Sequence, residues 1–183
     1  LNQKETTQMK HAKLFIAITA LILLTSGFSY SQGMMPPKPL ENEFFDGMVG
    51  NSSGENFING KIHKENVEIK WDLNHQYIVI NYSSQNKDNA EDRYQGLGIY
   101  GIDASGKVKS WWFDVWGAGN ASAGEGTISG DKMQITENSP FYHSDNTYEF
   151  RDKMMIVTRK GHYKTQDGKE IPFEDVSKFT RNK

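Results

Sequence analysis

The sequence predicts an all-β fold, a single closed or nearly closed antiparallel β-barrel of about nine to ten strands with one short N-terminal helical turn. Short segments of alternating polar and apolar residues recur along the chain, while helical periodicity is nearly absent. Most breaks between these segments carry dipeptides suited to tight hairpins, such as Asn59-Gly60, Gly130-Asp131 and Asp167-Gly168. Closure into a barrel is expected because it leaves no edge strand unpaired.

Residues 1–31 have the pattern of a short upstream extension followed by a cleaved signal peptide. Basic residues after Met9 precede an apolar run over 14–24, and Ser29-Tyr30-Ser31 is a small-x-small cleavage site. The run is shorter than the roughly 20 residues that a membrane-spanning helix needs. We therefore expect export to the periplasm or the extracellular space, without stable membrane insertion after cleavage. An uncleaved membrane anchor is the alternative.

Cleavage after Ser31 leaves residues 32–183, which suffice for one domain. The removed segment holds three lysines and one glutamate, so the formal net charge falls from -2 for the whole chain to -4. This acidic balance argues against nucleic acid or an anionic membrane as a partner. The chain contains no cysteine, which excludes disulfides, thiolate metal sites and a lipid-modified cysteine.

The mature chain begins with a proline-rich tether over 32–39, followed by the barrel domain over 40–183. Residues 40–46 can form one or two helical turns, with an apolar stripe of Leu40, Phe44 and Phe45 that could plug one end of a barrel. A polar surface loop is expected over 83–92. Strands are expected at 48–58, 61–72, 76–84, 93–102, 107–116, 123–129, 132–137, 146–150, 153–164 and 175–182.

Side-chain alternation along each strand indicates which residues face the barrel interior. If Lys107 and Lys109 face water, the same strand directs inward Val108, Ser110, Trp112, Asp114 and Trp116. On the second strand, the inward set is Val67, Ile69 and Trp71. Trp111 and Phe113 then lie on the outer face and need cover from the N-terminal stripe or from a protein partner. A β-bulge would exchange these assignments.

Five segments together resemble a bacterial family of exported proteins known only as a domain of unknown function. They are LENEFFDGMVG at 40–50, YQGLGIYGID at 94–103, WWFDVWG at 111–117, GEGT at 124–127 and FTR at 179–181. Their order and spacing match across nearly the whole mature chain. The resemblance implies a lipocalin-like barrel of the calycin kind, distantly similar to fatty-acid-binding proteins and to the haem-binding nitrobindins. It implies no established reaction.

The chain also departs from the pattern of these relatives. They usually carry a tryptophan shortly after the Val-Gly of the first strand, but Val49-Gly50 is followed here by Asn-Ser-Ser. Arg181 matches the closing arginine, although its usual stacking partner is missing. The last strand also lacks the histidine that would ligate iron in a nitrobindin-like pocket, which argues against haem. We expect no cofactor.

Three motifs are better explained by structure than by chemistry. Gly96-x-Gly98-x-x-Gly101 has the spacing of a dinucleotide fingerprint, but it lies within a strand and no helix follows to receive a pyrophosphate. Strand glycines commonly permit bending or close packing. The adjacent residues of His143-Ser144-Asp145 cannot converge as a catalytic triad does. The histidines are scattered along the chain and predict no metal site, unless strand pairing brings them together: His63, His75, His143 and His162.

The function that this pattern favours is non-covalent binding of a small, largely apolar molecule inside the barrel. Apolar contact would come from Trp71, Tyr100, Trp112 and Trp116, and Asp114 with Arg159 or Arg181 would orient a polar end. Simple core packing also explains the tryptophans. A second hypothesis is a structural or protein-interaction module with a filled core, which would use Trp111 and Phe113 as its contact surface. Catalysis ranks third, as an enzyme of unknown reaction with Asp114 and His162 as general acid and base.

Overall fold

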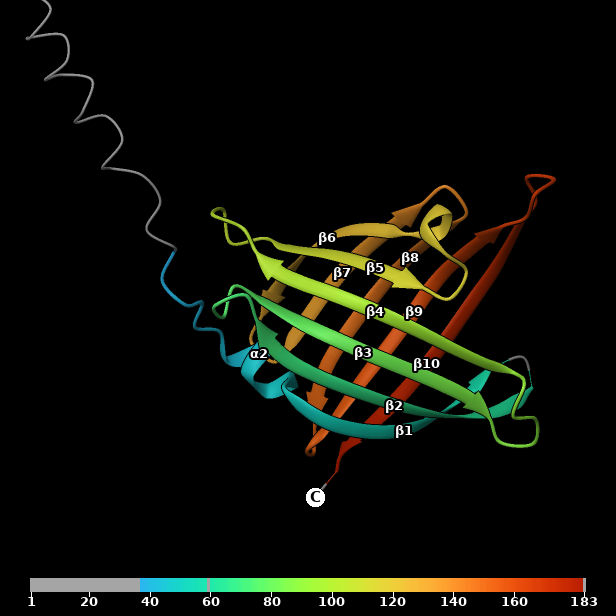
Figure 1. The fold of residues 1–183 in the computed structure, drawn as a ribbon, viewed down its shortest axis with the longest axis horizontal. Coiled ribbons are helices and arrows are strands. Elements are labelled where there is room, and N and C mark those ends of the chain that lie inside the picture. The colour runs from blue at the N-terminus through green and yellow to red at the C-terminus, as the bar shows by residue number, and fades with distance from the viewer. Residues whose placement is uncertain (1–36, 59, 183) are drawn as a thin grey trace, which may run out of the picture. The chain divides into compact units, whose positions relative to one another are not determined.

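The computed structural model describes residues 37–58 and 60–182, and within them ten antiparallel strands form a closed barrel (Figure 1). Each strand pairs with its neighbours in the chain, and β1 pairs with β10 to close the sheet. The predicted fold class is confirmed. The strands are β1 (Gly50–Ile58), β2 (Lys61–Asp72), β3 (Tyr77–Asn86), β4 (Arg93–Ile102), β5 (Val108–Asp114), β6 (Ser122–Ser129), β7 (Lys132–Ser139), β8 (Tyr142–Arg151), β9 (Met154–Lys164) and β10 (Glu170–Arg181).

Several strands are longer than the sequence predicts, among them β3, β8 and β10. β8 begins at Tyr142, where we expected a loop up to residue 145, and β3 continues to Asn86. Both extensions carry polar residues on the inner as well as the outer face, so the alternation that marks a half-buried strand is hidden. β10 begins at Glu170 and includes Pro172, which pairs with His162 of β9. The proline is tolerated because β1 pairs with β10 only over Lys178–Arg181.

The helix α2 (Glu43–Met48) fills one end of the barrel, which we call the floor end. Asn42 caps the helix, since its Oδ1 accepts a hydrogen bond from the Phe45 backbone N–H at 3.0 Å. Phe44, Phe45 and Met48 are buried in the barrel core, so the plug expected from the apolar stripe is present. The expected signal segment lies outside the described residues.

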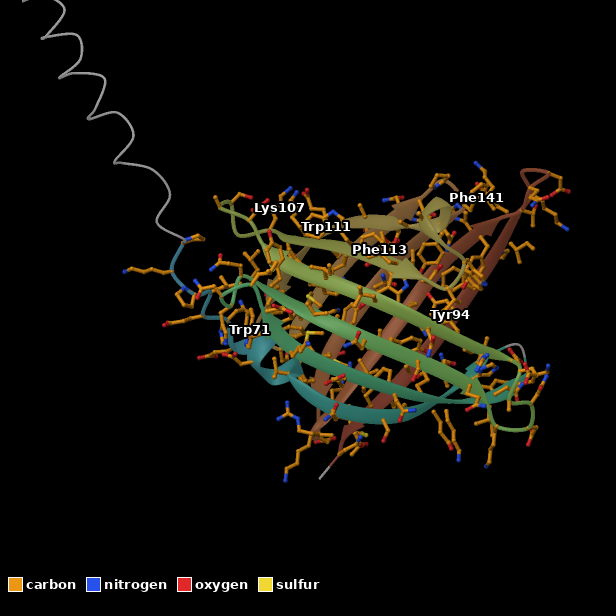
Figure 2. The ribbon with its side chains drawn as sticks, in the orientation of Figure 1. Trp71, Tyr94, Lys107, Trp111, Phe113 and Phe141 are labelled. Atoms are coloured by element: carbon orange, nitrogen blue, oxygen red, sulfur yellow. The ribbon has the colours of Figure 1, made fainter. Side chains whose placement is uncertain are left out.

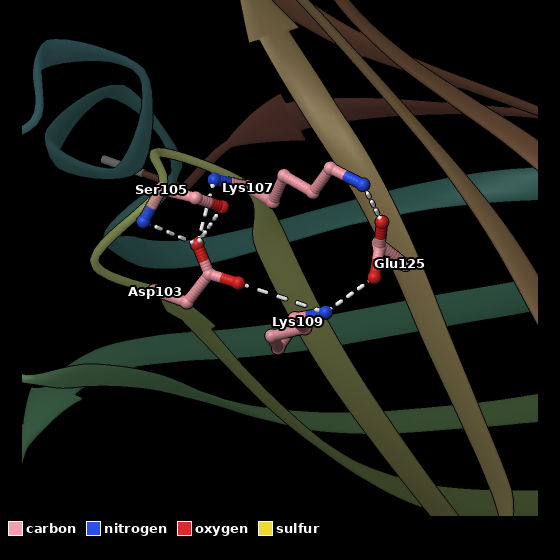
Figure 3. Close-up of polar contacts among 5 residues, drawn as sticks. All are labelled: Asp103, Ser105, Lys107, Lys109 and Glu125. Carbon is pink, nitrogen blue, oxygen red and sulfur yellow. Dashed lines mark hydrogen bonds and ion pairs between the residues drawn. The ribbon is translucent and has the colours of Figure 1, made fainter.

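A charged network on the outer face of β5 and β6 shows which way the strand faces (Figure 3). Lys107 and Lys109 both donate to the Glu125 carboxylate of β6, and Lys109 also lies 3.6 Å from Asp103. Hydrogen bonds from Ser105, together with the backbone N–H of Lys107, lower the pKa of Asp103 to about 2. Exposed ion pairs of this kind add little stability. They confirm the predicted strand orientation, which directs Val108 and Ser110 into the core.

The barrel interior is divided along its axis. The floor half is filled by large apolar side chains that leave no water-accessible surface or almost none, among them Phe45, Ile78, Tyr100, Met133 and Ile135. Towards the other end, which we call the upper half, the inward-facing residues are polar or aromatic. The buried polar residues are Asn56, His63, Glu65, Ser84, Asn86, Ser110, Ser122, Glu137, Ser144, Asn146 and Ser177.

We predict that Phe45→Ala lowers the free energy of unfolding by about 3–5 kcal/mol, because it removes a ring that packs α2 into the floor end. Phe45 is 0% exposed, whereas Phe57 on the outer face of β1 is 67% exposed. Phe57→Ala is therefore the matched control and should change stability by less than about 0.5 kcal/mol. Urea denaturation followed by tryptophan fluorescence measures both. Equal effects of the two variants would show that α2 does not hold the floor end closed.

Candidate functional site

The strand register brings a set of polar and aromatic side chains together in the upper half of the interior. In one row, Tyr82 of β3 lies opposite Gly96 of β4, which lies opposite Asp114 of β5. In another, Asn146, Arg159 and Asp175 lie side by side on β8, β9 and β10. We call the following set the upper cluster: Glu65, Tyr82, Tyr94, Trp112, Asp114, Arg159 and Asp175.

Arg159 is the positive charge of the upper cluster. Its Nε donates to Asp175 Oδ1 at 2.8 Å, its Nη2 reaches Ser177 Oγ at 3.4 Å, and the same Nη2 lies 3.8 Å from Glu65 Oε1. Burial acts to lower the pKa of Arg159, but the nearby Asp175, Tyr82 and Glu65 outweigh it and raise the pKa well above the ordinary value. The guanidinium is therefore always charged. Although the side chain faces inward, it remains 24% exposed, so solvent reaches it.

Glu65 lies beside Arg159 with one carboxylate oxygen unsatisfied. The side chain is 0% exposed, and Oε1 accepts a hydrogen bond from the Tyr82 hydroxyl. Burial raises the pKa of Tyr82, which keeps this hydroxyl a neutral donor. Oε2 has no hydrogen-bond partner among the described residues. A buried acceptor without a partner costs about 1–3 kcal/mol, so this oxygen would gain from any donor that reached it.

Asp114 lies on the wall of the upper half opposite Arg159, and among the described residues its side chain accepts hydrogen bonds from neutral donors only. Its Oδ2 accepts from the Tyr94 hydroxyl at 3.2 Å and from Asn120 Nδ2 at 2.9 Å, and its Oδ1 accepts from the Trp116 backbone N–H at 2.9 Å. Trp112 Nε1 in turn donates to the Tyr94 hydroxyl at 2.7 Å. No basic side chain of the described residues forms an ion pair with Asp114.

Two glycines of β4 make room for the Trp112 indole. A Cβ at Gly96 would lie 2.2 Å from Trp112 Cζ2, and one at Gly98 would lie 3.0 Å from the same ring. Such distances are too short for real Cβ contacts, so the indole lies flat against bare backbone. This close packing explains two positions of the Gly-x-Gly-x-x-Gly motif without any nucleotide. At the third, Gly101, the neighbour is the Tyr77 ring, 2.7 Å from a Cβ.

Glu137 marks the boundary between the two halves of the interior. Its carboxyl group accepts hydrogen bonds from Tyr100 at 3.3 Å, Ser110 at 3.1 Å and Asn146 at 3.1 Å. Burial raises the pKa of Glu137, and these hydrogen bonds only partly oppose that effect. The protonated form is therefore favoured relative to an exposed glutamate.

The residues predicted to bind a ligand lie at different places along the barrel. Trp112, Asp114 and Arg159 all belong to the upper cluster. The inward prediction for Trp116 is wrong, because β5 ends at Asp114 and the Trp116 side chain is 65% exposed. Its ring still lies 5.3 Å from that of Tyr94, at the rim of the site. Tyr100 is fully buried in the core, where its hydroxyl meets that of Tyr148 at 2.8 Å.

The remaining two predicted residues, Trp71 and Arg181, lie at the floor end. Figure 2 shows Trp71 beside α2 and Tyr94 towards the opposite end of the barrel. Trp71 Nε1 donates to Asp46 Oδ1 at 2.8 Å. Arg181 Nη2 donates to the backbone carbonyls of Gly47 and Val49 at 2.9 and 2.6 Å. Both side chains join α2 to the barrel, so neither takes part in the upper cluster.

The structure separates the residues of the catalytic hypothesis. Asp114 faces the interior from β5, whereas His162 lies on the outer face of β9, where its ring stacks on that of His143 at 5.3 Å. The two side chains share no space, so they cannot act together as general acid and base. No group of three or more histidines and carboxylates within residues 37–58 and 60–182 is arranged to hold a metal ion.

Trp111 and Phe113 lie on the outer face, as the strand alternation predicts (Figure 2). They are 38% and 41% exposed, and the N-terminal apolar stripe does not cover them because it packs into the floor end. Trp111 touches only the edge of the Tyr77 ring at 6.3 Å among the described aromatic side chains. A protein partner at this surface stays a prediction.

Sequence reasoning missed four members of the upper cluster, Glu65, Tyr82, Tyr94 and Asp175. The alternation that places Val67 and Ile69 inside also places Glu65 inside, two residues earlier on the same strand. The signal was therefore present, but a glutamate is usually assigned to the solvent face.

Comparisons with known proteins find no matching family model and no matching curated protein. The resemblance to an exported lipocalin-like family stays a prediction. No helix in the described part of the chain is both long enough and apolar enough to cross a bilayer.

We predict that Gly96→Ala displaces the Trp112 indole and lowers the free energy of unfolding by about 1–3 kcal/mol, because the new methyl group would overlap the ring. Near-ultraviolet circular dichroism and urea denaturation measure the two effects. Gly119→Ala is the control, since a Cβ there would meet nothing within 4 Å. A wild-type spectrum and stability for Gly96→Ala would contradict the packing described here.

We predict that Glu137→Gln changes the pH dependence of stability. A carboxyl group whose folded-state pKa is raised above its unfolded value, here 4.5, stabilises the fold at low pH, and this contribution is lost as the pH rises through the folded pKa. Glutamine stays neutral, so the stability of the variant relative to wild type should increase from about pH 4 to pH 8. Urea denaturation across this range measures the difference.

The matched control is Glu149→Gln. A hydrogen bond from Arg151 lowers the pKa of this partly exposed carboxyl group, so the stability of the control relative to wild type should fall as the pH rises. The same trend in both variants would contradict the assignment of Glu137 as a buried acid with a raised pKa.

Proposed function

We propose that the protein binds a small molecule non-covalently in the upper half of the barrel, between the Glu65–Arg159 wall and the Tyr94–Asp114 wall. The observation that carries this proposal is the unsatisfied Oε2 of Glu65, fully buried next to an arginine that solvent still reaches. Burying ionisable side chains opposes folding, so a buried group of them with one unsatisfied oxygen supports a binding role.

The filled floor half limits the ligand. Phe45, Ile78 and Tyr100 leave no accessible surface there, so a long acyl chain could not extend down the barrel axis. The proposed ligand is therefore shorter than a fatty acid and carries at least one polar group that donates a hydrogen bond. Its body would contact the aromatic side chains of the upper half, Tyr94, Trp112 and Trp116.

We place the entry of the ligand where the pairing of β1 with β10 ends. β1 pairs with β10 only from Ser52 to Glu55, whereas β9 pairs with β10 from Glu170 to Thr180. Beyond Glu55, the two strands are joined near the site by a side-chain contact from Asn56 Nδ2 to Asp175 Oδ1 at 3.4 Å. Breaking one such contact is a smaller barrier than opening a continuous ladder, so a ligand could enter beside Arg159.

The lipocalin-like resemblance and the signal-peptide pattern extend the proposal to an exported carrier or sensor of this small molecule. Both rest on the sequence. A carrier or sensor of this kind would use the charged and aromatic side chains of the upper half, while α2 closes the floor end. Catalysis has no support from the geometry, because Asp114 and His162 lie on opposite faces.

We predict that the protein purified from its own host retains a non-covalent ligand, seen as added mass by native mass spectrometry. Tyr94→Ala should reduce the occupied fraction by about tenfold, because the variant removes both an aromatic contact and a hydroxyl that bonds Asp114. Tyr77→Ala, which removes a tyrosine on the outer face of β3, should retain it. Bare protein mass, together with unchanged tryptophan fluorescence in a small-molecule extract of the host, would contradict the proposal.

A further inference from the structure

We infer that the ligand is an organic cation, of the alkylated ammonium class, held by Asp114 and by the aromatic rings around it. The inference rests on the proposed function, since it names the kind of molecule that the upper half binds. It follows from three features of the upper half: its charge, its aromatic rings and its unsatisfied carboxylate oxygen.

The charges that face inward in the upper half are unbalanced. Three carboxylates of the upper cluster, Glu65, Asp114 and Asp175, face a single guanidinium, that of Arg159. Arg159 is already engaged, at 2.8 Å from Asp175 and 3.8 Å from Glu65. An anionic ligand would have to displace these carboxylates. Asp114 accepts hydrogen bonds from neutral donors alone among the described residues, so a cation would add an ionic attraction to it.

A connected group of aromatic rings lies beside Asp114, which accepts a hydrogen bond from one of them through the Tyr94 hydroxyl. The Trp112 ring lies 6.1 Å from that of Tyr82, the Tyr82 ring lies 5.9 Å from that of Tyr94, and the Tyr94 ring lies 5.3 Å from that of Trp116. The faces of such rings are electron-rich and attract a cation, most strongly when the ring is an indole. Alkyl groups on the ammonium would also cover the Trp116 side chain, which is 65% exposed.

Aromatic rings also line the wall of the upper half that β8, β9 and β10 form. Tyr142 and Phe173 stack at 5.7 Å, and Tyr163 lies 4.7 Å from Phe173. Burial raises the pKa of Tyr163; Arg159 opposes this, whereas Asp175 and Asp114 add to it. A cation in this space would meet aromatic side chains from both walls.

The buried oxygen of Glu65 indicates a second contact. Glu65 Oε1 accepts a hydrogen bond from the Tyr82 hydroxyl. The Tyr82 ring packs against those of Tyr94 and Trp112, so the Glu65 carboxylate lies next to the group of rings beside Asp114. Its Oε2 has no partner among the described residues. A ligand that carried an N–H or O–H donor in addition to its cationic group would satisfy this oxygen. A bare metal ion fits less well, because the rings provide no ligands for it.

The test uses matched probes of one shape and different charge. Choline, its neutral carbon isostere 3,3-dimethylbutan-1-ol and the anion 3,3-dimethylbutyrate are titrated into the wild-type protein, with isothermal calorimetry and tryptophan fluorescence as readouts. Choline should bind at least about tenfold more tightly than the neutral isostere, and the anion should bind least. Equal binding of choline and its isostere would overturn the inference.

Variants locate the binding to Asp114 and the rim. Asp114→Asn and Trp116→Ala should each weaken choline binding by about tenfold. Their matched controls on the outer face, Asp145→Asn and Trp111→Ala, should leave it unchanged. Because Trp116 is largely exposed, its variant should fold, which thermal melting verifies. Full choline affinity in Asp114→Asn would overturn the assignment.

The outcomes distinguish this inference from the proposed function. If native mass spectrometry shows a retained ligand that is neutral or anionic, the cation assignment fails while small-molecule binding stands. If no ligand is retained, no host extract changes the fluorescence and none of the three probes binds, both fail. A retained ligand with a fixed or protonated positive charge supports both.

Discussion

The pairing of β1 with β10 is the contact on which the rest of the structure depends. It turns a ten-stranded sheet into a barrel and so gives every strand an inner and an outer face. The pairing is short, since it joins only Ser52–Glu55 to Lys178–Arg181. Arg181 reinforces its floor end by donating to the carbonyls of Gly47 and Val49, which ties the last strand to the end of α2.

β1 and β10 are paired towards the floor end and are not paired towards the upper end. This difference accounts for an apolar interior in one half of the barrel and a polar interior in the other. The floor half is close-packed and apolar, and it supplies the hydrophobic stabilisation of the fold. The upper half contains two hydrogen-bonded groups, one around Arg159 and one around Asp114, and Glu65 in the first is left partly unsatisfied. Polar groups at this depth oppose folding unless they are paired, and the proposed ligand would pair the one Glu65 oxygen that has no partner among the described residues.

The aromatic side chains also divide by role. Trp71 anchors α2 and Tyr100 fills the core, whereas Trp112 and Tyr94 share a hydrogen bond beside Asp114. A count of aromatic residues could not distinguish these roles, because all four face inward or towards the helix. The distinction comes from where each residue lies along the barrel axis, and therefore from the register of its strand.

The sequence by itself determined the barrel, its turns, the helical plug and the facing of most strands, because these depend on local alternation and turn chemistry. It also placed Trp112 and Asp114 on the inner face and named Arg159 as a candidate to orient the polar end of a ligand. Only the tertiary structure decided which inward residues meet, since the partners of Asp114 and Arg159 come from strands far apart in the chain. It moved Trp116 to the rim and Arg181 to the floor end, and it showed that Glu65 is buried. Alternation along one strand specifies whether a side chain faces the interior or the solvent. The register between strands specifies where along the barrel axis that side chain lies, and register is set by contacts between strands rather than within them.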